Sequence, residues 1–264
     1  MSTGTTSIII PTWEQLEYLQ QCLESIDAFT PELHEVIIVD NGSTDGTVEW
    51  VKKQLPKHRE YILIRNNKNI GAAAATNQGI GIAKGDYLCF LNNDVVVSKE
   101  WLKGLIDCVE SAKDLGMVGP RTNFVSGPQI VTDTAAGYDT LMKYQVYAEN
   151  FRKAYRGLYT PYWRIIPFCG LVRKEAMAKV GNFDEQFYPG NFGDDDLCLR
   201  LCLAGYRNMI CGDVFVHHHG SVSMRKIDFT ANLAECEKKF NAKWAKKPTI
   251  SAVMIVRDEE KCIA

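Results

Sequence analysis

The 264-residue sequence lacks several features that would place it in a special class of protein. It has no Cys-x-x-Cys pair, so its nine scattered cysteines indicate neither a zinc knuckle nor a disulfide framework. No apolar run reaches the roughly 18–20 residues of a membrane span, and no secretion signal is visible. The net charge is only −2, which argues against a nucleic-acid partner. We therefore expect reduced thiols, no transmembrane segment, and a cytoplasmic location or one at the inner face of a membrane.

Strands and helices alternate through the first half of the sequence. Short apolar runs predict buried strands, and apolar residues spaced three or four apart predict amphipathic helices. The expected strands are Ser7–Ile10, Val36–Val39, Tyr61–Ile64 and Tyr87–Leu91. The expected helices are Glu14–Ala28, Thr47–Leu55, Ala72–Ala83 and Lys99–Ala112. This order is typical of βαβ units, so the sequence predicts an α/β fold with a Rossmann-like, mostly parallel central sheet flanked by helices.

The second half is less regular. Residues 120–160 contain aromatic residues, glycine and proline without a clear period, which is typical of an insertion or lid. Beyond them we expect strands at Pro167–Val172 and Val214–Val216, and helices at Lys174–Val180, Asp195–Ala204 and Asp228–Ala245.

The last residues resemble the first. Ile250–Val256 is an apolar run followed by a polar helix start, as at the beginning of the chain. A closing edge strand is one interpretation, and the first strand of a second, similar domain is the one that we favour. We therefore expect one domain over residues 1–247, then a linker and a truncated second domain over 248–264, with further domains in a longer parent chain.

Two polar clusters follow expected strands, where parallel sheets bind their ligands. An aspartate directly after a strand, as at Asp40, can accept hydrogen bonds from a nucleobase or a ribose, although Asp40–Asp45 also suits a capped turn. Asn92, Asn93 and Asp94 offer the hard oxygen ligands that Mg²⁺ or Mn²⁺ prefers. The two clusters are therefore candidates for a ligand site.

Acids and histidines gather further along the chain. Asp194, Asp195 and Asp196 open an expected helix, whose dipole favours acids at that end. Three consecutive like charges repel one another, which is easier to explain if one is a base or faces a metal. In the run His217–His219, strand alternation sends His218 to the opposite face from its neighbours, and at least one imidazole could join Asp94 at a metal.

Several segments occur in an order that resembles one enzyme family. They are Ser7–Thr12, Val36–Asp45, Asn69–Gly71 with Asn77, Asn92–Asp94 and Gly193–Arg200. Together they are similar to the family 2 glycosyltransferases, inverting enzymes with the GT-A fold, and to bacterial surface-glycan or protein-glycosylating members more than to processive synthases. The resemblance implies metal-dependent transfer of a sugar from a nucleotide-diphosphate sugar to a hydroxyl of a glycan, a lipid-linked glycan or a protein.

The resemblance also implies a donor site. Pro11 and Thr12 would line the nucleotide pocket, and Asp40 would bind the base, usually uracil, so that a UDP-sugar such as UDP-GlcNAc is the expected donor. The segment beside the nucleotide and the donor sugar is matched by Asn69, Gly71 and Asn77.

A metal and a base follow from the same resemblance. Asn92, Asn93 and Asp94 match the DXD motif, whose last acid, Asp94, would hold Mn²⁺ or Mg²⁺ together with His218. His217 and His219 are alternative ligands. The general base would be Asp194, with Asp195 as the reserve candidate, and Gly193 stands where the family has glutamate.

Two other functions are weighed against this one. A nucleotidyltransferase would need a glycine-rich, basic loop after the first strand, and none is visible between Pro11 and Glu17. A non-catalytic domain that binds a sugar nucleotide or a glycan stays an alternative because of the two asparagines in the DXD motif, but the enzyme is the function that we expect. Metal-dependent hydrolysis of a sugar nucleotide would argue against that second alternative.

Overall fold

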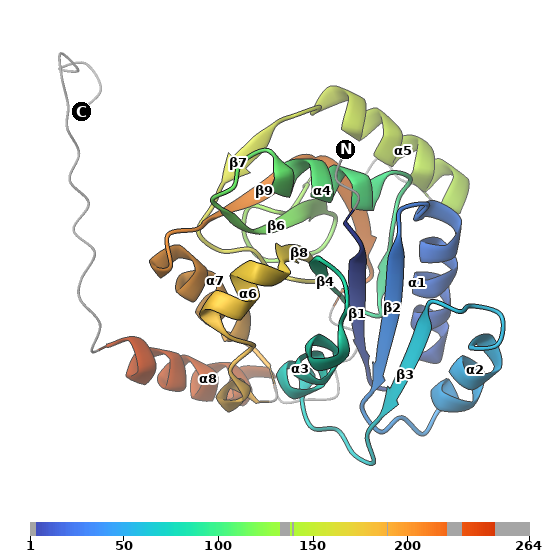
Figure 1. Cartoon of the computed structure of the whole chain (residues 1–264), viewed down its shortest axis with the longest axis horizontal. Helices are drawn as coiled ribbons and strands as arrows, with labels where there is room; N and C mark the ends of the chain where they lie inside the picture. The colour runs from blue at the N-terminus through green and yellow to red at the C-terminus, as the bar shows by residue number, and fades with distance from the viewer. Residues whose placement is uncertain (1–3, 133–137, 139, 189, 221–228, 246–264) are drawn as a thin grey trace.

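A computed structural model describes residues 4–132, 138, 140–188, 190–220 and 229–245. A nine-stranded mixed sheet runs through it in the order β3-β2-β1-β4-β8-β6-β9-β5, with β7 also paired to β9 (Figure 1). The strands are β1 (Thr6–Thr12), β2 (His34–Asp40), β3 (Tyr61–Arg65), β4 (Tyr87–Leu91), β5 (Val95–Val96), β6 (Leu115–Thr122), β7 (Tyr159–Pro161), β8 (Cys169–Arg173) and β9 (Arg207–His218).

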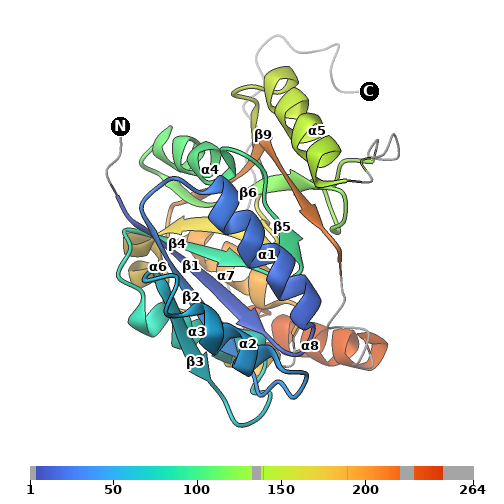
Figure 2. The same cartoon turned by 90° about the vertical axis from the view of Figure 1, so that its right-hand side faces the viewer.

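Helices cover both faces of this sheet (Figures 1 and 2). They are α1 (Leu16–Phe29), α2 (Thr47–Gln54), α3 (Ala72–Ile82), α4 (Trp101–Glu110), α5 (Leu141–Ala154), α6 (Lys174–Val180), α7 (Gly193–Leu203) and α8 (Phe229–Trp244), with a short 3₁₀ helix η1 (Glu185–Phe187) before α7. The α/β architecture expected from the sequence is therefore confirmed.

The first four strands form the parallel part of the sheet. β1 pairs in parallel with β2 and with β4, and β2 pairs in parallel with β3. The apolar runs of β1, β2 and β4 are buried on both faces, while β3 at the edge is partly buried. Ile8 and Ile10 belong to a core cluster with residues of α1 and α4, whereas Ile9 belongs to a second cluster with residues of α3, α6 and α7. The runs lack alternation because helices cover the sheet on both sides.

Three strands and one α-helix were not predicted from the sequence: the short strands β5 and β7, the strand β6 and the helix α5. Residues 115–122 form β6, which pairs in parallel with β9, while β8 runs antiparallel between β4 and β6. Residues 141–154 form helix α5, whose Tyr144 and Phe151 pack with Phe215 of β9. The region expected to be an irregular insertion, residues 120–160, therefore contains the end of β6, helix α5, which packs on β9, and the start of β7.

Two further expectations concern membranes and thiols. Within the described ranges, no helix is both long and apolar enough to cross a bilayer. The eight cysteines that the structure describes are free thiols, and seven of them are buried. Burial raises the pKa of thiols such as Cys22, so they remain protonated. The strand predicted at Ile250–Val256 lies outside the described residues.

Candidate active site

Polar residues meet where β1, β2 and β4 end. Thr12 closes β1 opposite Asp40, the last residue of β2, and Asn92–Asp94 follow β4 directly. The Asn93 side-chain amide donates to Oγ1 of Thr12 at 2.9 Å, and both residues are buried. Five of the predicted residues therefore share the carboxyl edge of the sheet, as parallel strands require.

Asp40 shapes the loop that follows β2. Its carboxylate is fully buried and accepts hydrogen bonds from the backbone N–H groups of Gly42 and Ser43, each at 3.2 Å. Gly42 has a φ of 82°, and a Cβ there would lie 2.8 Å from the Lys68 backbone, so only glycine suits this turn. The turn that the sequence left as an alternative is therefore present, and contact between Asp40 and a nucleobase stays a prediction.

Asn41 organises the neighbouring loop and was not recognised from the sequence. Its side-chain amide donates to Oδ1 of Asn69 and to the carbonyl of Gly71, at 3.1 and 3.2 Å. Its side-chain oxygen accepts from Asn66 and from the N–H of Ile70. Asn69 and Gly71, which were predicted to lie beside the sugar-nucleotide donor, are thus both bound by the buried side-chain amide of Asn41. In the sequence, Asn41 is visible only as the first residue of an Asn-Gly turn.

Gly71 and Asn77 touch the segment that leads into α7. Gly71 has a φ of 91°, and a Cβ there would lie 2.6 Å from the ring of Tyr188. The Asn77 amide donates to the carbonyl of Phe183 and to Glu185, both at 2.9 Å, and accepts from the N–H of Phe183. Asn77 therefore links α3 to this segment through its side-chain hydrogen bonds. Its contact with a sugar-nucleotide donor stays a prediction.

His218, at the end of β9, faces Asp94. Its Nε2 lies 3.2 Å from Oδ1 of Asp94, and its ring stacks on Phe168 at 5.1 Å. Nδ1 donates to the carbonyl of Phe124 at 2.8 Å, because a carbonyl can only accept. Burial raises the pKa of Asp94, but a hydrogen bond donated by the protonated form of His218 outweighs burial and brings that pKa below its usual range.

This arrangement fits a cation. With the proton on Nδ1, a neutral His218 directs the Nε2 lone pair at the Asp94 carboxylate, so that two acceptors face each other. The Asn92 amide approaches Nε2 at 3.5 Å, and a second proton on the ring or a divalent cation would relieve the opposition with Asp94. An imidazole nitrogen beside a carboxylate oxygen suits Mn²⁺, and the hydrogen bond to Phe124 is the outer contact that orients a ligating histidine.

The two neighbouring histidines have other surroundings. Nδ1 of His217 lies 2.8 Å from the hydroxyl of Tyr138, and burial lowers the pKa of His217 to about 4. His219 packs its ring against the edge of Tyr18, and burial lowers its pKa as well. Strand alternation thus gives His218 alone of the three a side-chain contact with the Asp94 carboxylate, whereas His219 donates its backbone N–H to the Asp94 carbonyl at 3.0 Å. The role of His218 as a metal ligand stays a prediction.

The acids at the start of α7 divide into two sets. Asp194 and Asp195 face Arg164, whose Nη2 lies 3.4 Å from Oδ2 of Asp194 and whose Nε lies 2.7 Å from Oδ1 of Asp195. Burial and the neighbouring Asp194 charge raise the pKa of Asp195 to about 7 in spite of Arg164. The two residues predicted as candidates for the base, Asp194 and Asp195, therefore contact the same cation, Arg164. The sequence analysis did not identify Arg164.

Asp196 points the other way and holds α8 against α7. It has no exposed surface, and its oxygens lie 2.8 Å from Nε of Arg200, 2.6 Å from Nζ of Lys243 and 3.1 Å from the indole nitrogen of Trp244. The third acid of the run is therefore structural.

Replacing Asp196 with asparagine should lower the free energy of unfolding by about 3 kcal/mol, because two cations then lose a buried counter-charge. Urea denaturation measures the change. The control is Asp114→Asn, whose exposed partner Arg207 stays hydrated, so its denaturation midpoint should barely move. Equal midpoints for the two variants would show that Asp196 does not stabilise the fold.

One cavity of about 800 Å³ lies between the polar residues at the carboxyl edge of the sheet and the acids at the start of α7. Its lining includes five predicted site residues, namely Pro11, Asn92, Asp194, Asp195 and His218. Arg164 lines it as well, together with several phenylalanines, among them Phe124 and Phe168. The remaining predicted residues do not line this cavity: they are Thr12, Asp40, Asn69, Gly71, Asn77, Asn93 and Asp94.

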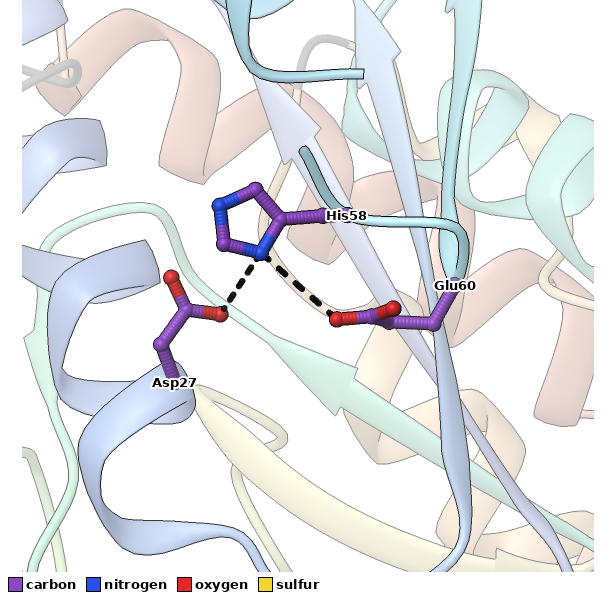
Figure 3. A group of neighbouring side chains, drawn as sticks. All are labelled: Asp27, His58 and Glu60. Atoms are coloured by element: carbon purple, nitrogen blue, oxygen red, sulfur yellow. Dashed lines mark ion pairs between the residues drawn. The ribbon is translucent and has the colours of Figure 1, made fainter. Parts of the chain in front are cut away.

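A second group of potential metal ligands lies at the other end of the sheet (Figure 3). Nδ1 of His58 lies 3.5 Å from Asp27 and 3.6 Å from Glu60, close to where β3 begins at Tyr61. All three side chains are at least a quarter exposed, and a protonated His58 between two carboxylates forms an ordinary surface ion pair. The group lies by the amino end of β3, away from the carboxyl edge that carries Asp94.

The sequence has recognisable relatives. Residues 7–181 match the family profile described as "Glycosyl transferase family 2". The uncharacterized protein y4gI of Sinorhizobium fredii is 28% identical over 230 residues, 84% of this chain and 25% of that protein. Glycosyltransferase GlyG of Streptococcus pneumoniae is 26% identical over 232 residues, 86% of this chain and 75% of GlyG. The chain thus spans a quarter of the first relative and three quarters of the second.

Solved structures share the fold. The mannosyltransferase PcManGT from Pyrobaculum calidifontis, in complex with GDP-Man and Mn²⁺, matches with a TM-score of 0.67 at 19% identity, over 94% of this chain and 66% of that one. TarS from S. aureus, in complex with UDP-GlcNAc, matches with a TM-score of 0.65 at 16% identity, over 93% of this chain and 68% of that one. These likenesses confirm the GT-A fold expected from the sequence.

Proposed function

The chain belongs to glycosyl transferase family 2, and we propose that it transfers a sugar from a nucleoside-diphosphate sugar to an acceptor hydroxyl, with inversion at the anomeric carbon. One observation carries the proposal. His218, whose imidazole faces Asp94, and Asp194 line the same cavity. A pair suited to holding a cation and a carboxylate suited to taking a proton are thus within reach of one bound substrate, as a single displacement requires.

In this mechanism Asp194 accepts the proton of the acceptor hydroxyl. The hydroxyl oxygen forms a bond to the anomeric carbon as the bond from that carbon to the diphosphate oxygen breaks, and the nucleoside diphosphate leaves. Asp94 and His218 would hold Mn²⁺ or Mg²⁺, which when bound neutralises charge that develops on the leaving diphosphate. The phenylalanines that line the cavity exclude water from the reacting atoms.

We propose UDP-GlcNAc as the first donor to test. TarS binds UDP-GlcNAc and PcManGT binds GDP-Man, so the fold accommodates either class of base. The acceptor is proposed to be a glycan, a lipid-linked glycan or a protein hydroxyl, and the protein is proposed to act in the cytoplasm or at the inner face of a membrane.

The test is release of nucleoside diphosphate from a set of sugar nucleotides with Mn²⁺, with Mg²⁺ and with chelator. We expect metal-dependent release from one donor at least tenfold above the rate for the others. The matched control is Arg207→Gln, a change at a surface ion pair remote from the cavity, which should leave the rate unchanged.

Binding of a sugar nucleotide without any metal-dependent hydrolysis or transfer would favour the non-catalytic binding domain instead. Absence of binding to UDP, GDP and dTDP sugars alike would contradict both functions.

A further inference from the structure

Arg164 belongs to a segment that is held rigidly between β7 and β8. The carbonyl of the preceding residue, Trp163, accepts from the Asn208 amide of β9 at 2.8 Å. The N–H of the following residue, Ile165, donates to Sγ of Cys198 in α7 at 3.2 Å, and that thiol donates back to the Ile165 carbonyl. Arg164 is therefore fixed to the same helix that carries the acids it contacts.

The contacts of Arg164 with the two acids are unequal. The guanidinium lies 2.7 Å from Asp195 and 3.4 Å from Asp194, and its side chain is 27% exposed while theirs are 10% and 15%. One cation faces two adjacent carboxylates, so the group as a whole has one negative charge in excess. Burial and the Asp194 charge raise the pKa of Asp195 to about 7 against the opposing effect of Arg164, so the pair holds one proton near neutral pH.

We infer that Arg164 is a positioning residue: its guanidinium lies against both carboxylates and favours the ionised form of the pair, so that a carboxylate, Asp194 in the proposed function, is free to take the proton of the acceptor hydroxyl. This inference rests on the proposed function of the site. It adds Arg164 to the residues that act on the general base. Asp196, the third acid of α7, has no part in this because it contacts Arg200, Lys243 and Trp244 instead.

The other ionisable groups near Asp194 and Asp195 are neutral or are paired with other residues. On α7 itself, Cys198 has a pKa raised by burial and stays neutral. From β9, His218 lines the same cavity and faces Asp94. From α8, Lys243 is engaged by Asp184 and Asp196. Among the described residues, Arg164 is therefore the cation that bears directly on Asp194 and Asp195.

The first variant to make is Arg164→Gln. Loss of the cation makes ionisation of the pair harder, so the part of the kcat profile that rises with pH should move up by about one pH unit. At pH 6 the variant should be about tenfold slower than the wild type, and above pH 9 the two rates should converge. Arg164→Lys keeps the charge without the planar fork and should recover most of the shift.

A second variant, Asp195→Asn, separates the two acids. It removes the neighbouring negative charge, so Asp194 should ionise more readily and the rising part of the profile should move to lower pH, with turnover kept within about tenfold. The control is Arg207→Gln, whose side chain forms an exposed ion pair with Asp114 and does not line the cavity.

A second readout does not need turnover. The carboxyl carbons of aspartate-labelled protein can be titrated by NMR, and the signals that disappear in Asp194→Asn and in Asp195→Asn assign the two acids. The wild-type pair should take up one proton near pH 7, and Arg164→Gln should raise that midpoint by about one unit.

The two readouts distinguish the possible failures. If the wild type turns over a donor but Arg164→Gln lowers kcat equally at every pH, Arg164 is merely structural and the inference is wrong. An unmoved NMR midpoint in Arg164→Gln overturns it as well. If the NMR midpoint moves as expected but the wild type uses no donor, the proposed function is wrong. In that case Arg164 still controls the ionisation of the two acids, but not for catalysis of sugar transfer.

Discussion

Replacement of Asp194 by asparagine should lower kcat for sugar transfer by about 10³-fold and leave KM for the donor nearly unchanged. The substitution keeps the shape of the side chain and its place beside Arg164, and removes only the ability to take a proton from the acceptor. General-base catalysis contributes roughly 10²–10⁴-fold, and a group that acts only in the transition state appears in kcat. Steady-state kinetics with the donor identified in the hydrolysis screen measure both constants.

Asp195→Asn is the matched control, because it changes the adjacent residue of the same helix in the same way. A larger loss in Asp195→Asn than in Asp194→Asn would reverse the assignment and make Asp195 the base. Equal and small losses in both variants would show that neither carboxylate takes the proton.

Asp94→Ala should weaken Mn²⁺-dependent binding of UDP about 100-fold or more. Asp94 is buried and its pKa is below the usual range, so the side chain is present as a carboxylate that can hold a cation. A metal on a diphosphate contributes several kcal/mol, and each factor of ten in affinity is about 1.4 kcal/mol. Calorimetric titration of UDP with and without Mn²⁺ measures the difference.

Without Mn²⁺ the wild type and Asp94→Ala should bind UDP equally, which separates loss of the metal from loss of the fold. Asp114→Ala, at an exposed ion pair, should bind UDP as the wild type does under both conditions. If Asp94→Ala keeps metal-dependent binding, the metal is held elsewhere, and His58→Gln then tests the group of Asp27, His58 and Glu60.

The parallel half of the fold could be predicted from the sequence because each of its strands is a continuous apolar run that ends at polar residues. Strand β6 and helix α5, which were not predicted, lack such a clear apolar pattern. β6 contains Gly116, Gly119 and Pro120, which normally indicate a loop, and Pro120 is tolerated because it lies beyond the residues of β6 that pair with β8. In α5, exposed apolar residues such as Met142 blur the helical period.

The candidate site was predicted in part for a similar reason. Residues at the carboxyl ends of strands could be placed at one edge of the sheet because parallel topology requires it. Side-chain partners could not, because they depend on contacts between distant segments. Asn41 looks like a turn residue, and Arg164 looks like any arginine in an irregular segment until β7, β8 and α7 are assembled around it.

The register of β9 determines which histidine reaches Asp94. The pairing of β6 with β9 jumps from Pro120 opposite Cys211 to Arg121 opposite Phe215, so three residues of β9 are absorbed in an irregular stretch. Beyond it, β5 pairs with His217 and His218. A slip of one residue would exchange the two faces of the strand and present His217 or His219 to Asp94 in place of His218. The three consecutive histidines are therefore not interchangeable copies of one ligand, because the irregular stretch between β6 and β9 selects among them.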